Sequence, residues 1–241
     1  MSRDVLYMGT RNVYHQMPAA IWSLLKHTPS IDRVFLMVED DEVPQMLPDP
    51  RIQIINVSNQ TLFPETGPNY KNWWAWIVLV RVALPKFLPD DVEKILSMDN
   101  DTVVFQDIGD LWDIPMGKNV LAMALDIEEM QWPGCPYFNG GICMHNLIEE
   151  RKLTDRWIRM MNTDKFKYPE QDLFSKTCRG RIIELPREYN VMPAYLDDIK
   201  NPKVIHYAGV KHHENFLWVQ KYHDEAIEII ERGKMPERIS G

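Results

Sequence analysis

Two aspartates that could bind a metal stand close together in "KILSMDNDTVVF" (residues 94–105). If this apolar segment is an extended strand, Asp99 and Asp101 lie on one face, because side chains alternate along a strand. Neighbouring carboxylates repel each other unless a positive charge lies between them, and a divalent cation such as Mg²⁺, Mn²⁺ or Ca²⁺ suits their oxygens. The alternative is a solvated turn, in which Asp and Asn are common.

The rest of the chain predicts an α/β domain in which strands and helices alternate, which favours a mainly parallel central sheet flanked by helices. The near-continuous apolar runs are typical of strands that are buried on both faces. Asn146, with Glu149 three residues later, predicts a helix start of the capping-box type. We expect strands over residues 4–9, 33–38, 51–57, 94–99, 119–126, 137–146 and 203–209, helices over residues 17–27 and 222–233, and a Trp-rich helix ending near residue 84.

Several polar residues are expected at the carboxyl ends of strands, where ligands of parallel α/β sheets gather. Asp99 and Asp101 follow one predicted strand, and Asp126 ends another. The paired glycines 140–141 interrupt a third strand, a pattern typical of close approach by a ligand or another segment. His206 near the end of the last strand is compatible with either a metal ligand or a hydrogen-bonded core histidine.

The length of 241 residues fits one large α/β domain or two small ones, and because no linker rich in Gly, Ser or Pro divides the chain, we expect one domain over residues 1–241. A content of 45% hydrophobic and 26% charged residues is ordinary for a soluble globular protein. A formal net charge of −8 argues against general nucleic-acid binding, which usually needs a basic surface. No apolar run reaches the roughly 18 residues of a transmembrane helix, and the first residues lack the apolar core of a signal peptide. The three cysteines, Cys135, Cys143 and Cys178, form no CxxC pair, so reduced thiols and a cytoplasmic location are expected.

Four stretches carry a family resemblance: "MDNDTVVFQDIGDLW", "YFNGGICMHNL", "PEQDLF" and "IHYAGVKHHENFLW". In this order they resemble glycosyltransferase family 8, which includes glycogenin and bacterial lipopolysaccharide α-galactosyl- and α-glucosyltransferases. The resemblance implies a GT-A fold, a single Rossmann-like domain that uses a nucleotide-diphosphate sugar and Mn²⁺, with Mg²⁺ as the alternative ion. It also implies transfer to a glycan or glycoconjugate acceptor with retention of anomeric configuration.

The resemblance also implies roles for individual residues. Gln171 matches the residue beneath the anomeric carbon, and Asp172 matches its acidic neighbour, although an Asp here also suits an ordinary helix N-terminus. Asp126 matches an acidic position near the sugar hydroxyls. The implied metal ligands are Asp99, Asp101 and His206, and the implied donor-binding residues are Thr10, Asn12, Arg81, Asn100, Asn139, Gly140, Gly209, Lys211 and His212.

The chain departs from the family pattern near both of its ends. Thr10 stands where the family has an Asp that grips the base, and Tyr14 is one place late, although Asn12 still fits. These departures change the expected base-binding pattern. UDP-glucose or UDP-galactose is expected as the donor from the family resemblance and not from these residues. The segment "VKHHEN" replaces a Lys-Pro-Trp, so Lys211 is expected to bind the diphosphate, with His212 as its rival.

Together these features predict a metal-dependent hexosyltransferase. The amide of Gln171 would be a poor covalent nucleophile, which favours front-face attack assisted by the leaving phosphate. A sugar nucleotidyltransferase is an alternative, but that class normally has a glycine-rich phosphate loop where this chain has "YMGTRNVYHQ". A non-catalytic nucleotide-sugar-binding protein is a second alternative, against which the retained metal ligands argue. A glycoside hydrolase would need a carboxyl pair without the metal and nucleotide residues.

Overall fold

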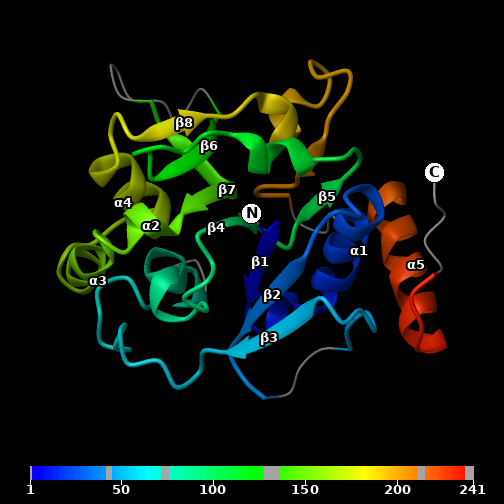
Figure 1. Cartoon of the computed structure of the whole chain (residues 1–241), viewed down its shortest axis with the longest axis horizontal. Helices are drawn as coiled ribbons and strands as arrows, with labels where there is room; N and C mark the ends of the chain where they lie inside the picture. Colours follow the sequence, from blue (N-terminus) through cyan, green and yellow to red (C-terminus); the bar gives the residue numbers. More distant parts are fainter. Residues whose placement is uncertain (1, 42–44, 72–75, 128–135, 211–214, 237–241) are drawn as a thin grey trace.

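The computed structural model describes residues 2–41, 45–71, 76–127, 136–210 and 215–236. A seven-stranded sheet in the order β3-β2-β1-β4-β7-β6-β8 forms its centre (Figure 1). Every residue of the neighbouring strands β1 and β4 is buried, as expected for strands covered on both faces. The strands of this sheet are β1 (Asp4–Gly9), β2 (Arg33–Val38), β3 (Ile52–Asn56), β4 (Lys94–Met98), β6 (Leu121–Leu125), β7 (Phe138–Asn146) and β8 (Ile182–Glu184).

The direction of β7 brings the paired glycines to the aspartates. β1 is parallel to β2 and β4, β2 is parallel to β3, and β6 is parallel to β8, whereas β7 is antiparallel to both β4 and β6. The first residues of β7 therefore lie beside the carboxyl end of β4, where Met98 pairs with Ile142. The Asp99 N–H continues this pairing by donating to the Gly141 carbonyl at 2.8 Å.

A two-stranded sheet of β5 (Thr102–Val104) and β9 (Val204–His206) joins two segments that are far apart in the sequence. The strands are antiparallel, and Thr102 pairs with His206. The Tyr207 N–H donates to the Asp101 carbonyl at 2.9 Å. This pairing places His206 next to the residues that follow β4.

The helices form two groups (Figure 1). In one group α1 and α5 lie side by side, and Trp22 Nε1 donates to Glu225 Oε2 at 2.6 Å. In the other group α3 and α4 pack on each other and on η2, with the rings of Trp157 and Phe174 in contact. The α-helices are α1 (Met17–His27), α2 (Leu147–Glu150), α3 (Thr154–Thr163), α4 (Pro169–Thr177) and α5 (Leu217–Arg232), and the 3₁₀ helices are η1 (Arg11–Gln16), η2 (Trp76–Lys86), η3 (Gly109–Asp113), η5 (Arg187–Tyr189) and η6 (Pro193–Tyr195).

Most of the expected elements are confirmed, and several predictions need correction. The last strand, β9, is shorter than expected, and the last helix, α5, begins five residues earlier than expected. The helix over residues 17–27 and the strands over residues 4–9 and 33–38 have the expected bounds. The described part of the Trp-rich segment is the 3₁₀ helix η2, and residues 72–75 lie outside the described residues. Asn146 does precede α2, but its side chain donates to the carbonyls of residues 117 and 119 instead of capping the helix, so the capping-box prediction was wrong.

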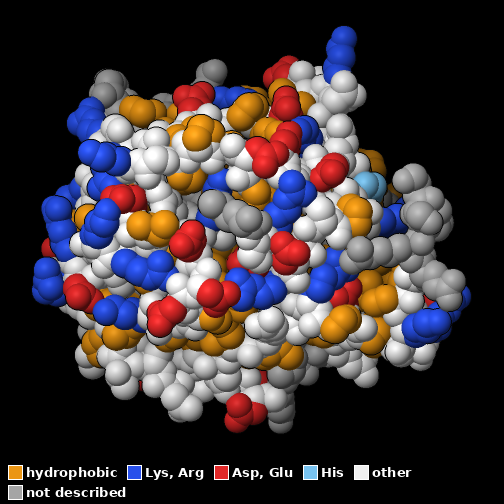
Figure 2. Space-filling view, viewed as in Figure 1, with side chains coloured by type: hydrophobic (Ala, Val, Ile, Leu, Met, Phe, Trp, Pro, Cys, Tyr) orange, Lys and Arg blue, Asp and Glu red, His pale blue; other side chains and the backbone are white. Residues whose placement is uncertain are grey.

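The surface carries charges of both signs. Figure 2 shows Lys and Arg side chains interspersed with Asp and Glu side chains over the viewed face. Arg33 illustrates such mixing, because it forms ion pairs with both Asp4 and Asp91. Within the part of the chain that the structure describes, each helix is too short or too polar to span a bilayer.

Candidate active site

Three side chains able to bind a metal converge where β4 ends. His206 Nε2 lies 3.4 Å from Asp101 Oδ1 and 3.7 Å from Asp99 Oδ2. One ligand atom from each of the three residues lies within 4.8 Å of the others. Two carboxylate oxygens and one imidazole nitrogen suit a divalent ion such as Mn²⁺. These residues therefore fit the metal that the family resemblance implies.

The two aspartates converge through a turn and not along a strand. β4 ends one residue before Asp99, and residues 99–101 turn into β5. The prediction that Asp99 and Asp101 share a face of an extended strand was therefore wrong. The backbone of residues 99–101 forms a turn, as the alternative interpretation stated. The turn is anchored in the interior, because Asn100 is buried and its Nδ2 donates to the Met8 carbonyl at 2.8 Å.

His206 is only 3% exposed, and its surroundings favour a charged ring. Burial acts to lower the pKa of His206, but the carboxylates of Asp101 and Asp99 outweigh it and raise the pKa. The ring fits because residue 141 is glycine: a Cβ at Gly141 would lie 2.0 Å from His206 Cε1. The second glycine of the pair thus makes room for the candidate metal ligand.

Arg81 is a buried cation that joins the turn of Asp99 and Asp101 to β7. Its Nη2 donates to Asp99 Oδ1 at 2.5 Å, and its Nη1 donates to the Gly140 carbonyl at 2.9 Å. Glu170 Oε1 lies 3.5 Å from the same Nη1. Burial opposes the charge of Arg81, but Asp99 and Glu170 outweigh burial and raise the pKa of the guanidinium. A permanent positive charge is therefore held at this point.

Gln171 and Asp126 form a fixed polar group beside the candidate metal ligands. Gln171 Oε1 accepts a hydrogen bond from the Gly140 N–H at 2.9 Å, and Gln171 Nε2 donates to Asp126 Oδ2 at 3.1 Å. Asn139 Nδ2 donates to the same Asp126 oxygen at 3.3 Å. The antiparallel direction of β7 is what brings Asn139 and Gly140 into this group.

Asp172 holds the first turn of α4. Tyr137 donates its hydroxyl to Asp172 Oδ1 at 2.6 Å, and the backbone N–H groups of Lys167 and Tyr168 donate to Asp172 Oδ2 at 2.9 and 3.0 Å. Burial and the bond to Asp172 raise the pKa of Tyr137, so its hydroxyl stays a donor. These contacts fix the helix that carries Gln171.

One cavity brings most of these side chains together. It adds two polar residues that the sequence did not point to, Tyr168 and Glu170. Burial raises the pKa of Glu170, which Arg81 opposes. Glu170 directly precedes Gln171, and this adjacency was the one available sequence signal. The cavity is lined by Val78, Arg81, Asp99, Asp101, Asn139, Tyr168, Glu170, Gln171, His206, Ala208 and Gly209.

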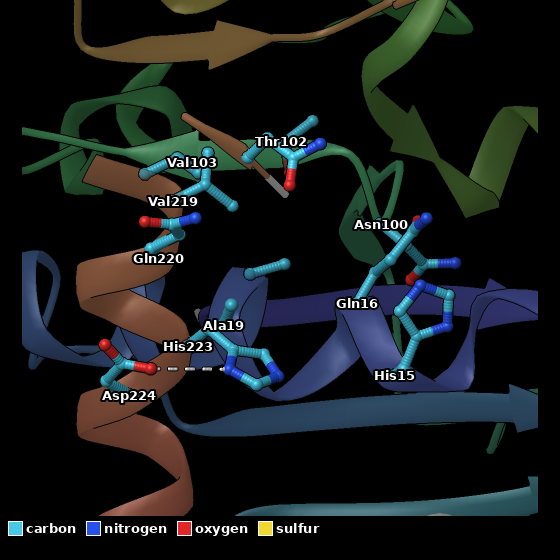
Figure 3. A pocket seen from close by; sticks show the side chains of 12 residues that line it. His15, Gln16, Ala19, Asn100, Thr102, Val103, Val219, Gln220, His223 and Asp224 are labelled. Carbon is cyan, nitrogen blue, oxygen red and sulfur yellow. Dashed lines mark ion pairs between the residues drawn. The ribbon is translucent and has the colours of Figure 1, made fainter. Parts of the chain in front are cut away.

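A second cavity of about 490 Å³ opens between α1 and α5 (Figure 3). Asn100, the middle residue of the turn between β4 and β5, lines this second cavity, whereas the flanking aspartates line the first cavity. His15 and Gln16 from the end of η1 and His223 from α5 contribute polar groups, and Val219 contributes an apolar wall. The volume lies within the range typical of small-molecule sites.

The other residues predicted to bind the donor differ in whether they reach either cavity. Thr10 is buried and Asn12 is exposed at the start of η1, and neither is among the described residues that line the two cavities. Gly209 lines the first cavity with φ +74°, a left-handed conformation that glycine adopts easily. Lys211 and His212 lie outside the described residues.

The fold is similar to that of solved glycosyltransferases of the GT-A type. The apo structure of the bifunctional glycosyltransferase WbbM is similar, with a TM-score of 0.72 and 21% identity over 95% of this chain and 49% of that chain. The galactosyltransferase LgtC, solved with donor and acceptor sugar analogs, gives a TM-score of 0.69 and 17% identity, covering 98% of both chains. At these identities the likeness shows the fold.

The chain belongs to the family described as Glycosyl transferase family 8, whose model matches residues 5–212. It is 28% identical over 142 residues to a lipopolysaccharide 1,2-glucosyltransferase of Escherichia coli K12, covering 53% of this chain and 42% of the relative. A putative glycosyltransferase of Haemophilus influenzae is 26% identical over 164 residues, covering 58% and 48%. The chain thus spans less than half the length of these two relatives.

Proposed function

We propose that the chain is a metal-dependent, retaining hexosyltransferase that moves a hexose from a nucleotide-diphosphate sugar to an acceptor hydroxyl. The observation that carries this proposal is that side chains able to bind a metal and hydrogen-bonded amides able to bind a sugar line one cavity. Asp99, Asp101 and His206 form the first set, and Asn139 and Gln171 belong to the second. A diphosphate joined to a sugar needs both sets side by side.

Asp99, Asp101 and His206 would hold the metal, for which the family resemblance favours Mn²⁺ over Mg²⁺. A bound divalent ion would neutralise the negative charge that develops on the leaving diphosphate. Arg81 supports this arrangement, because it bonds Asp99 Oδ1 while Asp99 Oδ2 faces His206. One oxygen of Asp99 is thereby fixed, and the other stays directed into the metal-binding cluster.

Gln171 would support the sugar electrostatically. Both ends of its amide are hydrogen-bonded, to the Gly140 N–H and to Asp126, so the amide cannot turn freely. A fixed amide oxygen is a poor nucleophile, but its dipole stabilises positive charge on the anomeric carbon. We therefore favour attack from the face that the diphosphate leaves, with a phosphate oxygen taking the acceptor proton. Asp126 and Asn139 would bind sugar hydroxyls, and Asp172 would act by holding α4.

The nucleoside would extend from the metal on the Asn100 side of the turn. Asn100 is bonded to the last residues of β1, after which Thr10 and Asn12 follow, and the second cavity opens on the same side. UDP is the proposed nucleotide because of the family resemblance. Gly209 begins the segment that carries Lys211 and His212, which we propose as diphosphate ligands.

The acceptor would be a hydroxyl on a glycan or glycoconjugate. This part of the proposal is supported by the Escherichia coli relative, which is named a lipopolysaccharide 1,2-glucosyltransferase. UDP-glucose and UDP-galactose are the donors we propose. A cytoplasmic location is proposed from the described cysteines, Cys143 and Cys178, which are buried free thiols.

Turnover of donor with and without metal tests the proposed function. The protein would be incubated with UDP-glucose, UDP-galactose or GDP-glucose in Mn²⁺, Mg²⁺ or EDTA, and the released nucleotide would be measured by chromatography. We expect slow release from a UDP-sugar in Mn²⁺ and none in EDTA. Full release in EDTA would exclude the metal mechanism. Thermal stabilisation by the donor without any release, even with glycan acceptors, would indicate a non-catalytic binding protein.

A further inference from the structure

Asn190 is a buried amide that connects the candidate metal ligand to the sugar side of the site. It follows η5, is 0% exposed, and precedes Val191, whose carbonyl accepts the His206 N–H at 3.0 Å. Its Oδ1 lies 3.0 Å from His206 Nδ1, and its Nδ2 lies 2.9 Å from Asn139 Oδ1. The side chain thus touches both halves of the cavity wall.

Asn139, Asn190 and His206 form a row of hydrogen-bonded side chains, and one backbone group determines the direction of every hydrogen bond in it. The Gly141 N–H can only donate, so the Asn139 atom that it meets at 2.9 Å must be the oxygen. The Asn190 atom that faces this oxygen must then be the nitrogen, which leaves the Asn190 oxygen facing His206. An amide oxygen can only accept, so Nδ1 of His206 carries a proton.

We propose that Asn190 is a positioning residue that fixes the tautomer of His206 for metal binding. With the proton on Nδ1, the lone pair of the neutral imidazole is on Nε2, the atom that lies 3.4 Å from Asp101 Oδ1. The opposite tautomer would present an N–H at this point and could not bind a cation there. This inference rests on the proposed metal site.

The same row ties the metal side to the sugar side. Asn139 donates to Asp126 Oδ2, the oxygen that also accepts from Gln171. A continuous path of hydrogen bonds therefore runs from His206 through Asn190 and Asn139 to Asp126. Turning the Asn190 amide by half a rotation would set its oxygen against the oxygen of Asn139, which already accepts from the Gly141 N–H. The row therefore has one favourable arrangement.

Three variants separate the role of Asn190 from a general loss of packing. Asn190→Ala removes both hydrogen bonds. Asn190→Asp keeps an acceptor for the Nδ1 proton and removes the donor to Asn139. Asn69→Ala is the matched control, because Asn69 is also buried (2% exposed) but donates to the carbonyls of Met161 and Asp164 and lines neither cavity.

Binding of Mn²⁺ alone, followed by the electron paramagnetic resonance of the free ion, is the first measurement. Asn190→Ala should weaken binding by about ten- to a hundredfold, as expected for a residue that orients a metal-binding histidine. Asn190→Asp should recover much of this loss. Asn69→Ala should melt at a lower temperature and bind Mn²⁺ like the wild type. Unchanged affinity in Asn190→Ala, or an equal loss in Asn69→Ala, would overturn the proposal.

The tautomer itself can be read without metal or donor from ¹H–¹⁵N correlations of the imidazole at alkaline pH. The wild type should carry the His206 proton on Nδ1, and Asn190→Ala should lose this preference. A proton on Nε2 in the wild type would overturn the inference, even where a variant fails to fold. A wild type that binds no Mn²⁺ would instead overturn the proposed function, whereas the tautomer measurement tests Asn190 separately.

Discussion

Two buried histidines lie in similar chemical surroundings and differ in what can reach them. His206 faces the carboxylates of Asp99 and Asp101 at the wall of a cavity. His145 on β7 lies between Glu150, 2.6 Å from its Nδ1, and Ser97, 2.9 Å from its Nε2. A hydroxyl, an imidazole and a carboxylate in this order are the groups of a hydrolytic triad.

Position along a strand explains why only the first cluster is a candidate site. Ser97, His145 and Glu150 are each 0% exposed, so no substrate can approach the hydroxyl. Ser97 lies within β4, whereas Asp99, two residues later, follows its carboxyl end. The difference teaches that residue types alone do not mark a site, and that the end of a strand, where a cavity opens, does.

The largest expected effect is the loss of turnover in Asp101→Asn. Removing one negative charge from the metal-binding cluster should lower turnover by about a thousandfold, or about 4 kcal/mol of transition-state stabilisation. Asp91→Asn is the control, since Asp91 pairs with Arg33 at the surface and is 67% exposed. Release of nucleotide from the donor in Mn²⁺ measures both variants. If Asp101→Asn retains wild-type turnover, the cluster has no role in the reaction.

A large effect on stability is expected at the closed cluster, which consists of the buried residues Ser97, His145 and Glu150. Glu150→Ala would leave His145 Nδ1 without a partner in the interior, so the free energy of unfolding should fall by about 3 kcal/mol. Ser97→Ala removes a hydroxyl bond of the same histidine and should cost about 1 kcal/mol. Urea unfolding measures both changes, and turnover per folded molecule should not change. Lost turnover with unchanged stability would give the closed cluster a chemical role.

An intermediate effect is expected where the backbone of β7 makes room for His206. In Gly141→Ala the new Cβ would overlap the imidazole, so the ring must move and Mn²⁺ affinity should fall about tenfold. Gly140→Ala offers a graded comparison, because its Cβ would meet Gln171 Cγ only at 3.2 Å. Gly140→Ala should lower the affinity for the sugar donor more than the affinity for Mn²⁺. Equal Mn²⁺ affinity in both variants and the wild type would show that the ring position does not matter.

The local sequence was sufficient for the elements with clear periodicity. The helix α1 and the strands β1 and β2 have the predicted bounds, because apolar spacing and burial agree there. The direction of β7 was not predictable, since a strand buried on both faces has the same apolar pattern in either direction. The convergence of Asp99 and Asp101 was predicted for the wrong reason, because a turn and not a strand face brings them together.

Residues without a motif could not be found from the sequence. Asn190 belongs to no recognisable pattern, and it reaches His206 because the segment around Val191 pairs with β9. Glu170 enters the cavity because α4 packs on η2, which carries Arg81. Both contacts join segments that are distant along the chain. The secondary-structure preference of a local segment carries no information on which distant segment it contacts.

The smallest expected effect is a pH dependence of stability that His206 gives to the metal-free protein. Asp101 and Asp99 outweigh burial and raise the pKa of His206, so the folded protein holds this proton more tightly than the unfolded chain. The gain in stability is complete below pH 6.5, the ordinary pKa of histidine. It is lost as the pH rises through the higher pKa of the folded state. His206→Gln should remove this decline, as measured by urea unfolding in EDTA.

Two controls, excess Mn²⁺ and the variant His27→Gln, show whether this pH dependence of stability comes from His206. Metal binding needs a neutral imidazole, so excess Mn²⁺ should reverse the trend and stabilise the wild type more as the pH rises. His27 has the opposite sign, because burial and then Lys26 lower its pKa, so its contribution falls as the pH drops below 6.5. His27→Gln should flatten only the acid side of the profile. A decline above pH 6.5 that persists in His206→Gln would mean that the carboxylates do not hold a proton on this ring.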